Sequence, residues 1–426
     1  MEKFGRKREE KERAVLVGLS ADVFSEAEQC SDETLDELEE LLRTAGGVCV
    51  GKVLQKRHSP DPATYIGEGK ALEVKALAET EEADLVIVDN EITPSQMRNL
   101  SKLIEKPVLD RSGLILDIFA ARAQTSEGRL QVELAQYRYV LSKLSGLGTS
   151  LSRLGGGIGT RGPGETKLET DRRHIRRHIS NLKEEFEKIR RVRATQRKKR
   201  TKESVPVVAL VGYTNAGKST LVNRLTGADL PANDRLFDTL DPSTRKLKLN
   251  DGLTVLFSDT VGFIRKLPTH LVEAFRATLE ELKFADLILH VVDVSKDDWP
   301  GDMRTTEEVM RSLGVETTPV LHVYNKIDLS DDAPKVDPES AAVSAKTGEG
   351  IPELLDKIEA VLFQTNRTVV LLLPYSEAKL LDELYQNAQV LRADYLDGGI
   401  AVTARGTRKA LARALPYEAP EDGTDG

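Results

Sequence analysis

The chain of 426 residues is longer than one hydrophobic core usually supports, so we expect several domains. With 39% hydrophobic and 31% charged residues, the composition is that of a soluble globular protein and excludes a disordered or membrane class. The net charge is −8, the N-terminus is charged, and no apolar run reaches the ~18–20 residues of a spanning helix, so we expect a cytoplasmic protein without stable membrane insertion.

The first 120 residues alternate apolar runs with amphipathic stretches. The pattern predicts strands at 13–18, 48–54, 84–89 and 107–110, and helices at 34–45, 70–78 and 94–104. Strands separated by helices are typical of a parallel sheet built from βαβ units. We therefore predict a small α/β domain over residues 1–120. Asp89 and Asp110, at strand ends, are interpreted as ordinary cap or turn residues.

Residues 121–203 carry no strand signal. Two long helical patterns flank a glycine cluster at 154–164, and the second pattern, from about Glu165, repeats apolar residues at spacings of three, four or seven. Residues 129–202 hold 20 Lys/Arg against 7 Asp/Glu, a net of +13 that leaves −21 for the rest of the chain. We predict an antiparallel helical hairpin that meets a polyanion, with a polar linker at 195–206.

A second α/β alternation fills residues 204–365, for which we predict a mostly parallel sheet with helices on both faces. Residues 366–426 continue with a strand at 368–373, a helix around 377–387, a strand near 400–403, another short helix and an acidic tail. This last segment is predicted to be a small α+β domain. The expected fold class is therefore α/β, with four successive domains.

The clearest motif lies at the start of the third domain. The apolar strand 207–211 runs into Gly212–Ser219, which reads GxxxxGK[ST] in the strand–loop–helix context that a P-loop requires. Glycines permit a tight turn whose N–H groups face a β-phosphate, Lys218 reaches the β- and γ-phosphate oxygens, and Ser219 supplies a hydroxyl to Mg²⁺. The predicted nucleotide contacts in this loop are Gly212, Tyr213, Thr214, Asn215, Ala216, Gly217, Lys218, Ser219 and Thr220.

Two further strings fit the phosphate end of the site. Strand 254–258 ends in Asp259-Thr-Val-Gly262, which would place a carboxylate in the outer shell of Mg²⁺ and the Gly262 N–H near the γ-phosphate. Thr239 offers a switch hydroxyl to the metal. We predict Lys218, Thr239 and Gly262 as the catalytic residues. The nucleotide contacts expected here are Phe237, Asp238, Thr239, Leu240, Asp241, Asp259, Thr260, Val261 and Gly262.

The base-binding motif follows strand 319–324. Asn325-Lys326-Ile327-Asp328 reads NKxD, and Asp328 can accept hydrogen bonds from guanine N1–H and the exocyclic amine. Adenine does not present these donors, and such a site can discriminate by ~10⁴-fold or more. Ser344-Ala345-Lys346 adds backbone groups for guanine O6. GTP or GDP is therefore the predicted ligand, and the expected contacts are Asn325, Lys326, Asp328, Ser344, Ala345 and Lys346.

At this point the sequence resembles translational and Obg-like GTPases in general and the HflX family in particular. The resemblance spans nearly the whole chain and rests on the strings RSGLILDIFAARA (111–123), EGRLQVELAQ (127–136), GGGIGTRGPGETKLETDRR (155–173), GYTNAGKST (212–220), LFDTLDPSTR (236–245) and DTVGFIRKLP (259–268). It implies a GTPase that binds the large ribosomal subunit and splits or rescues stalled or idle ribosomes. It also implies that the glycine loop and its hairpin face ribosomal RNA near the peptidyl-transferase centre.

Hydrolysis is expected to be slow without a partner. Ras-type enzymes carry a glutamine after DxxG that orients the attacking water, and here that position is Phe263. A phenyl ring cannot hold water, so turnover should lie within or below the ~10⁻⁴ to 10⁻² s⁻¹ of unassisted relatives. The resemblance relates Asn215 to GTPases that hold K⁺ beside the phosphates, and a structural asparagine is an equally good interpretation.

The arginines of the second hairpin helix are candidates for phosphate contacts. Arg172, Arg173, Arg176 and Arg177 spread over a broad face, and Arg190, Arg191, Arg193, Arg197 and Arg200 follow. The alternative is a solvated helix surface, which the local excess of +13 disfavours. His174 and His178 are assigned to the same exposed face. The expected partners are the large ribosomal subunit and its RNA, without DNA, and we expect a monomer.

Three alternatives stay open. The chain could be a binding module in which nucleotide only locks a conformation, although the complete magnesium set favours an enzyme. It could be an RNA-remodelling enzyme that uses GTP, although residues 1–200 show no second catalytic constellation. Gly67-Glu-Gly69-Lys70 could face phosphate, which leaves an ATP site in the first domain open.

Cys30 and Cys49 have no metal-ligand spacing, which argues against a disulfide framework and a zinc site.

Overall fold

The computed structural model describes residues 11–25, 28–144, 163–202, 205–227, 236–237, 243–249, 254–260, 262–266, 280–315, 318–330, 334–364, 366–407 and 411–419. The chain forms two compact units that alternate along the sequence. Unit 1 comprises Met1–Glu187, Asn233–Asp241 and Val261–Thr278, and unit 2 comprises Lys188–Ala232, Pro242–Thr260 and Leu279–Gly426. The division into four domains remains a prediction.

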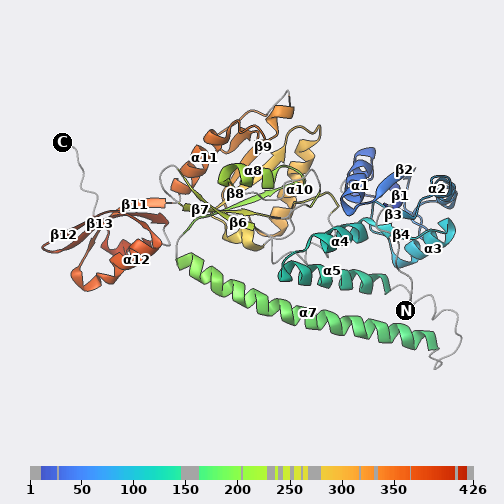
Figure 1. Ribbon diagram of the computed structural model, residues 1–426, viewed down its shortest axis with the longest axis horizontal. Coiled ribbons are helices and arrows are strands. Elements are labelled where there is room, and N and C mark those ends of the chain that lie inside the picture. The colour runs from blue at the N-terminus through green and yellow to red at the C-terminus, as the bar shows by residue number, and fades with distance from the viewer. Residues whose placement is uncertain are drawn as a thin grey trace. The chain divides into compact units, whose positions relative to one another are not determined.

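The first sheet of unit 1 is parallel throughout, with strand order β2-β1-β3-β4 (Figure 1). Helix α1 contacts α4, and α2 contacts α3. The side chains of α2 and α3 share a core cluster with alternate residues of β1 and β3. The strands are β1 (Arg13–Ala21), β2 (Val48–Arg57), β3 (Leu85–Val88) and β4 (Val108–Asp110), and the helices are α1 (Asp32–Ala45), α2 (Glu68–Thr80), α3 (Pro94–Ile104) and α4 (Arg111–Arg122).

Local sequence explains where these helices begin. Ser31 and Thr34 form a capping box at the start of α1, and Thr93 and Gln96 form another at α3, whose first helical residue is Pro94. The α1 helix then buries Leu35, Leu38, Leu41 and Leu42, which lie three or four residues apart and so share one face.

The hairpin predicted for residues 121–203 is present as α5 (Ser126–Leu144) and α7 (Pro163–Lys202), whose apolar side chains pack together. The hairpin's first helix is separate from α4, because the backbone is extended at Ala123 and Thr125 Oγ1 accepts from Gly128 N at 3.0 Å. One detail of the prediction is wrong. The residues predicted to start a linker at 195 continue α7, because Lys, Arg and Gln favour helix and no breaker occurs before Pro206. Residues 145–162, with most of the glycine cluster, lie outside the described residues.

The second sheet lies in unit 2 and has the order β10-β9-β8-β5-β7-β6. All neighbours are parallel except β6, which runs antiparallel to β7. Helices α8 and α11 share one core cluster with alternate residues of the strands, and α10 contacts β5 and β8. The strands are β5 (Val207–Gly212), β6 (Ser243–Lys248), β7 (Thr254–Asp259), β8 (Leu287–Asp293), β9 (Val320–Asn325) and β10 (Ser340–Val343), and the helices are α8 (Lys218–Thr226), α10 (Trp299–Ser312) and α11 (Ile351–Gln364).

The chain ends in a three-stranded antiparallel sheet of order β11-β13-β12, covered by α12. The strand β12 was not predicted from the sequence, because no clear alternation precedes its hairpin with β13. The elements are β11 (Asn366–Leu373), α12 (Lys379–Asn387), β12 (Gln389–Leu396) and β13 (Gly399–Thr407). The α/β fold class, with a mostly parallel sheet in the P-loop region, is confirmed. Among the helices that the structure describes, none combines the length and the apolar character that a bilayer crossing needs.

Candidate functional site: a nucleotide site on the second sheet

The loop between β5 and α8 has a geometry that requires glycine at two positions. Gly212 has φ +154°, and a Cβ there would lie 2.1 Å from Val291 O. Gly217, with φ +90°, is the N-cap of α8, and a Cβ there would lie 2.2 Å from Asn325 Nδ2. Because Gly217 has no side chain that could cap α8, the first N–H groups of the helix can bind an anion.

Lys218 is held inside this loop. Its Nζ donates to Gly212 O at 3.1 Å and to Tyr213 O at 2.8 Å, and the residue is 7% exposed. Burial lowers the pKa of Lys218 to about 8, an effect that the Asp259 carboxylate opposes and the Lys296 ammonium strengthens. A buried ammonium of this kind gains from a phosphate ligand, because the ligand's negative charge favours the protonated form.

Two oxygen groups meet beside the loop. Ser219 Oγ donates to Asp259 Oδ2 at 2.8 Å, and Asp259, the last residue of β7, is fully buried. Thr260 Oγ1 donates to Leu210 O at 2.5 Å and fixes the chain as it leaves β7. A hydroxyl and a carboxylate are the hard oxygen donors that Mg²⁺ prefers, so the residues present fit this ion.

Asn325 connects the phosphate loop with the base loop. Its Nδ2 donates to Ala216 O at 2.8 Å, and its Oδ1 accepts from Ala345 N at 3.0 Å. The structure therefore brings three separate strings of the sequence into one place. Asp328 lies beyond them in a short 3-10 helix, where its carboxylate is exposed. Ser344 is fully buried and accepts from Thr347 N at 3.1 Å, which shapes the loop around Ala345 and Lys346.

Two residues that support this base loop were missed from the sequence. Asp293, the last residue of β8, accepts from Lys326 Nζ at 2.6 Å, while Lys326 itself has φ +65°. Arg224 of α8 donates to Ala345 O at 3.1 Å and also to Lys346 O. Asp293 could have been found from the sequence, because it ends an apolar strand as Asp259 does. No local sequence pattern marks Arg224.

The other predicted contacts fall into two groups. Asp238, Thr239, Leu240, Asp241 and Val261 are outside the described residues. Phe237 and Gly262 belong to unit 1, where Phe237 packs edge-on against Phe119 with ring centroids 4.7 Å apart. Phe263 is 1% exposed.

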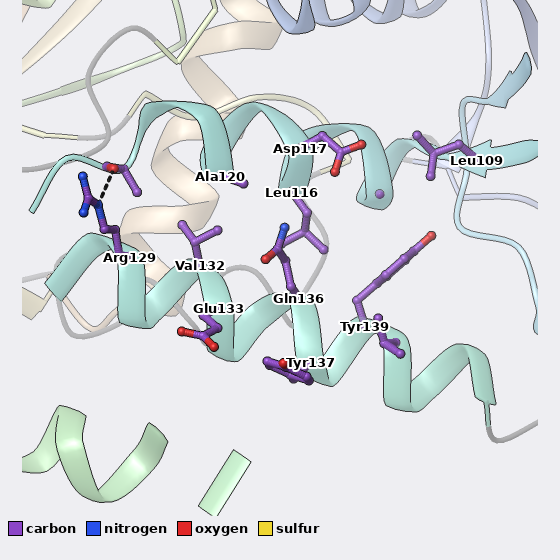
Figure 2. Close-up of a pocket in the computed structure, with 13 residues that line it drawn as sticks. Leu109, Leu116, Asp117, Ala120, Arg129, Val132, Glu133, Gln136, Tyr137 and Tyr139 are labelled. Carbon is purple, nitrogen blue, oxygen red and sulfur yellow. Dashed lines mark hydrogen bonds between the residues drawn. The ribbon is translucent and has the colours of Figure 1, made fainter. Parts of the chain in front are cut away.

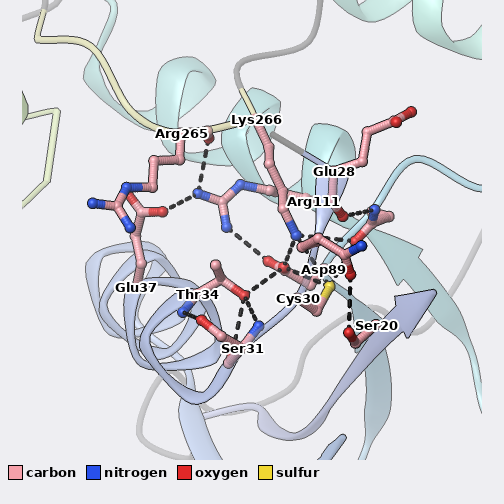
Figure 3. A network of polar contacts seen from close by, with 12 residues as sticks. Ser20, Glu28, Cys30, Ser31, Thr34, Glu37, Asp89, Arg111, Arg265 and Lys266 are labelled. Atoms are coloured by element: carbon pink, nitrogen blue, oxygen red, sulfur yellow. Dashed lines mark hydrogen bonds and ion pairs between the residues drawn. The ribbon is translucent and has the colours of Figure 1, made fainter. Parts of the chain in front are cut away.

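The segment that follows the DxxG string is anchored in unit 1 by a network of charged groups (Figure 3). Lys266 Nζ donates to Asp89 Oδ2 at 2.5 Å and to Asn90 Oδ1 at 3.1 Å. Arg111 donates to Asp89 Oδ1 at 2.7 Å, to Glu37 Oε2 at 2.6 Å and, from the same Nη2, to the backbone oxygen of residue 265 at 3.1 Å. Figure 3 shows Asp89 between the two cations.

The interpretation of Asp89 as an ordinary cap or turn residue is therefore wrong. Asp89 is fully buried and forms ion pairs with Arg111 and Lys266. Burial by itself would raise the pKa of Asp89, but the charges of these two cations hold it below its usual value. The interpretation is only partly right for Asp110. This residue caps α4 by accepting from Gly113 N at 3.0 Å, but it is also fully buried and accepts from Lys143 Nζ at 2.5 Å and from Tyr139 Oη at 2.8 Å.

The basic hairpin presents a mixed surface. Arg173 and Arg177 of α7 are exposed, whereas Arg172 and Arg176 lie 3.8 Å and 3.6 Å from Glu169 carboxylate oxygens. The assignment of His178 to the exposed face is only partly right. Its Nε2 lies 3.0 Å from Glu133 Oε1, and its ring packs on Tyr137 of α5.

A cavity of about 600 Å³ lies between α4 and α5 (Figure 2). Its lining combines apolar side chains such as Leu116 and Val132 with Asp117 and Glu133. At one end Arg129 Nε donates to Ala123 O at 3.3 Å. Burial raises the pKa of Asp117. None of the predicted nucleotide contacts that the structure describes lines this cavity.

Fold and site together define the class of protein. A six-stranded sheet whose first strand enters a P-loop, with an NKxD loop bonded to that P-loop through Asn325, is the site of a P-loop GTPase. This chain is an enzyme of that class, which hydrolyses GTP.

Comparison with known proteins identifies the family. Four family models match successive parts of the chain. Residues 32–120 match "GTP-binding GTPase N-terminal", and residues 122–200 match "GTP-binding GTPase Middle Region". Residues 207–326 match "50S ribosome-binding GTPase", and residues 331–416 match "HflX C-terminal domain". The chain belongs to the HflX family of GTPases, which confirms the resemblance noted in the sequence.

Relatives are similar over most of their length. GTPase HflX of Caldanaerobacter subterraneus subsp. tengcongensis is 50% identical over 93% of this chain and 92% of the relative, and GTPase HflX of Escherichia coli is 41% identical over 92% and 93%. Among solved structures, a GTP-binding protein from Sulfolobus solfataricus in complex with GDP has a TM-score of 0.43 at 25% identity, covering 82% of this chain and 98% of that chain.

Proposed function

We propose that this GTPase binds the large ribosomal subunit and that its nucleotide cycle splits or rescues stalled or idle ribosomes. The observation that carries the proposal is the surface of α7, where exposed arginines follow one another along a helix whose surrounding segment has a net charge of +13. Such a surface suits the phosphates of ribosomal RNA. The family description matched by residues 207–326 supports the same partner. The proposal implies a cytoplasmic protein, which we take to be a monomer.

The proposed nucleotide chemistry uses the residues around the P-loop. Lys218 and the N–H groups of Gly212–Thr220 bind the β- and γ-phosphates, and Asp328 reads guanine. Ser219 and Thr239 would hold Mg²⁺ directly, with Asp259 in its outer shell, and the ion would neutralise charge on the β- and γ-phosphate oxygens. The Gly262 N–H is assigned to the γ-phosphate.

Slow basal turnover is part of the proposal. Phe263 is 1% exposed and has no group that could orient water. At this position the chain therefore supplies no hydrogen bond to the attacking water, whereas Ras-type enzymes supply one from glutamine. We infer that the ribosomal subunit supplies the missing activation.

The role of Asn215 has two readings. Its φ of +62° is a conformation that asparagine tolerates better than most residues, which supports a structural role. A K⁺ ion beside the phosphates is the second reading. Faster hydrolysis in KCl than in NaCl, lost in Asn215→Gly, would support the ion, and equal rates would support the structural role.

Sucrose-gradient profiles test the function as a whole. Intact ribosomes are incubated with the full chain and GTP, GDP or a non-hydrolysable GTP analogue. We expect free subunits to accumulate with GTP and with the analogue, and not with GDP. The Lys218→Ala variant serves as the control that lacks nucleotide binding. Profiles that are the same for all three nucleotides would contradict the proposal.

A further inference from the structure

Two histidines lie next to each other on the face of the second sheet opposite its main core cluster. In β8, the neighbours Leu289 and Val291 point into the cluster that contains α8 and α11. His290 between them points to the other face, because side chains alternate along a strand. On β9 its register partner is His322, and the two ring centroids are 5.3 Å apart.

His290 is buried without a polar partner. It is 1% exposed, and neither of its ring nitrogens, nor Nδ1 of His322, has a hydrogen-bond partner among the residues that the structure describes. Buried polar atoms are almost always paired, so these three unpaired ring nitrogens call for an explanation. Burial, followed by the charges of His322 and Lys218, lowers the pKa of His290 to about 3.

A carboxylate faces the same point. Glu307 of α10 offers an oxygen that lies, with one nitrogen from each histidine, in a group whose three atoms are all within 4.8 Å of one another. The ligand atoms of a tetrahedral zinc site lie about 3.3 Å apart, so small side-chain rotations bring the three atoms into range.

We propose that His290, His322 and Glu307 bind one divalent transition-metal ion of the zinc type. Two imidazole nitrogens and one carboxylate are a donor set for such ions rather than for Mg²⁺, and three protein ligands leave a fourth position for water. The spacing of Cys30 and Cys49 had argued against a zinc site, but this site uses no cysteine. The proposal is independent of ribosome binding.

The ion would connect three elements that are far apart in sequence. It would tie β8 and β9 to each other and to α10. Three residues beyond the two histidines, these strands end at Asp293 and Asn325, which support the base loop. A bound ion is therefore expected to raise the thermal stability of unit 2.

The first measurement is a cobalt titration of the full-length chain after chelator treatment, with excess Mg²⁺ and GDP present so that the P-loop is occupied. Co²⁺ bound by nitrogen and oxygen ligands gives visible d–d absorption bands that free Co²⁺ in water lacks at that strength. We expect saturation at one equivalent and displacement by Zn²⁺. Thiolate-to-cobalt charge-transfer bands would instead indicate binding at Cys30 or Cys49 and would contradict the proposal.

Matched variants locate the site. His322→Gln and Glu307→Gln should weaken Zn²⁺ binding by at least ~10-fold. Loss of a residue that only hydrogen-bonds to a metal ligand already lowers metal affinity by ~10- to 100-fold, and these two residues would contact the ion itself. His58→Gln and Glu308→Gln, at exposed positions, should bind like the wild type. Zinc at about 100 times its Kd should raise the Tm of the wild type by roughly 5 °C, but not that of the site variants. Absent binding, or equal binding by site and control variants, would overturn the assignment.

Discussion

Lys218 is a P-loop residue whose protonation should depend directly on a bound phosphate. Its ammonium is buried in the P-loop and bonded to two carbonyl oxygens, and its pKa lies at about 8, against 10.5 for a solvated lysine. The unfolded chain therefore binds more protons than the folded one between these two values. It follows that this group opposes folding below pH 8 and that the opposition disappears as pH rises toward 10.5.

Nucleotide binding should take up a proton at alkaline pH. At about pH 9 the ammonium is largely deprotonated in the free protein, and a bound phosphate raises its pKa. Calorimetric titrations with GDP in two buffers of different ionisation enthalpy should therefore give different heats at pH 9 and similar heats at pH 7. Lys296→Met, which removes a neighbouring ammonium, should retain this uptake. Buffer-independent heats at pH 9 would contradict the account of Lys218.

Base specificity should depend on Asp328. Its carboxylate is exposed at the end of the base loop and can pair with donors that guanine presents. Asp328→Asn should weaken GTP binding by up to ~10⁴-fold and should admit xanthosine triphosphate, whose base offers the complementary acceptor. Equilibrium binding of both nucleotides measures the change, with Glu349→Gln as the exposed control. Wild-type GTP affinity in Asp328→Asn would refute the assignment.

Helices, strands and loops that are marked by residues close together in the sequence could be predicted. Helix α3 was predicted with the correct bounds because Thr93, Pro94 and Gln96 mark its start. The P-loop and NKxD residues were likewise readable from short strings. What could not be read is pairing between distant segments. Arg224 reaches the base loop 121 residues away, and Lys266 meets Asp89 across 177 residues, with no local pattern to mark either pair.

The network around Asp89 should be needed for the stability of unit 1. Asp89→Asn would leave the buried cations Arg111 and Lys266 without their shared carboxylate, which costs about 3–5 kcal/mol. Hydrogen exchange of the amides of β1 and β3 measures this loss locally, which suits a chain of two units better than one global unfolding curve. Asp22→Asn, whose side chain is 76% exposed, should change exchange little. Equal exchange in both variants would contradict the expected cost.

The same ion pairs predict a pH dependence. Because the folded-state pKa of Asp89 lies below the ordinary aspartate value of 3.8, its stabilising contribution is complete above about pH 4 and is lost as pH falls through the folded-state pKa. The protection of β1 and β3 amides in the wild type should therefore decline in acid more than in Asp89→Asn.

The hairpin helix α7 should determine how binding to large subunits depends on salt. Changing Arg172, Arg173, Arg176 and Arg177 to Ala should weaken pelleting with subunits and flatten its salt dependence, by up to ~0.9 in slope for each lost phosphate contact. A matched control removes four exposed cations outside the hairpin: Lys102, Arg304, Arg311 and Lys335. If both variants lose affinity equally, α7 is a solvated surface and has no special part in RNA binding.

For the whole molecule, the two units alternate along the chain, and the segment after DxxG belongs to the unit that contains the hairpin. The polypeptide leaves the Mg²⁺-binding candidate Asp259 and within seven residues reaches Lys266, which is bonded to Asp89. A change in this segment during the nucleotide cycle would therefore act directly on the unit that carries α5 and α7 through Glu187. This connection offers a physical route between the nucleotide site and the helix that we propose binds RNA.

The most direct test of the central claim is the rate of phosphate release from GTP with and without purified large subunits. We expect the wild type to release phosphate slowly alone and at least ~10-fold faster with subunits. This stimulation would be smaller than the ~10³–10⁵-fold rate increase that an arginine finger gives. The four-arginine variant should keep the basal rate and lose the stimulation at physiological salt. If large subunits do not accelerate the wild type, or accelerate the variant equally, then the basic hairpin does not couple ribosome binding to GTP hydrolysis.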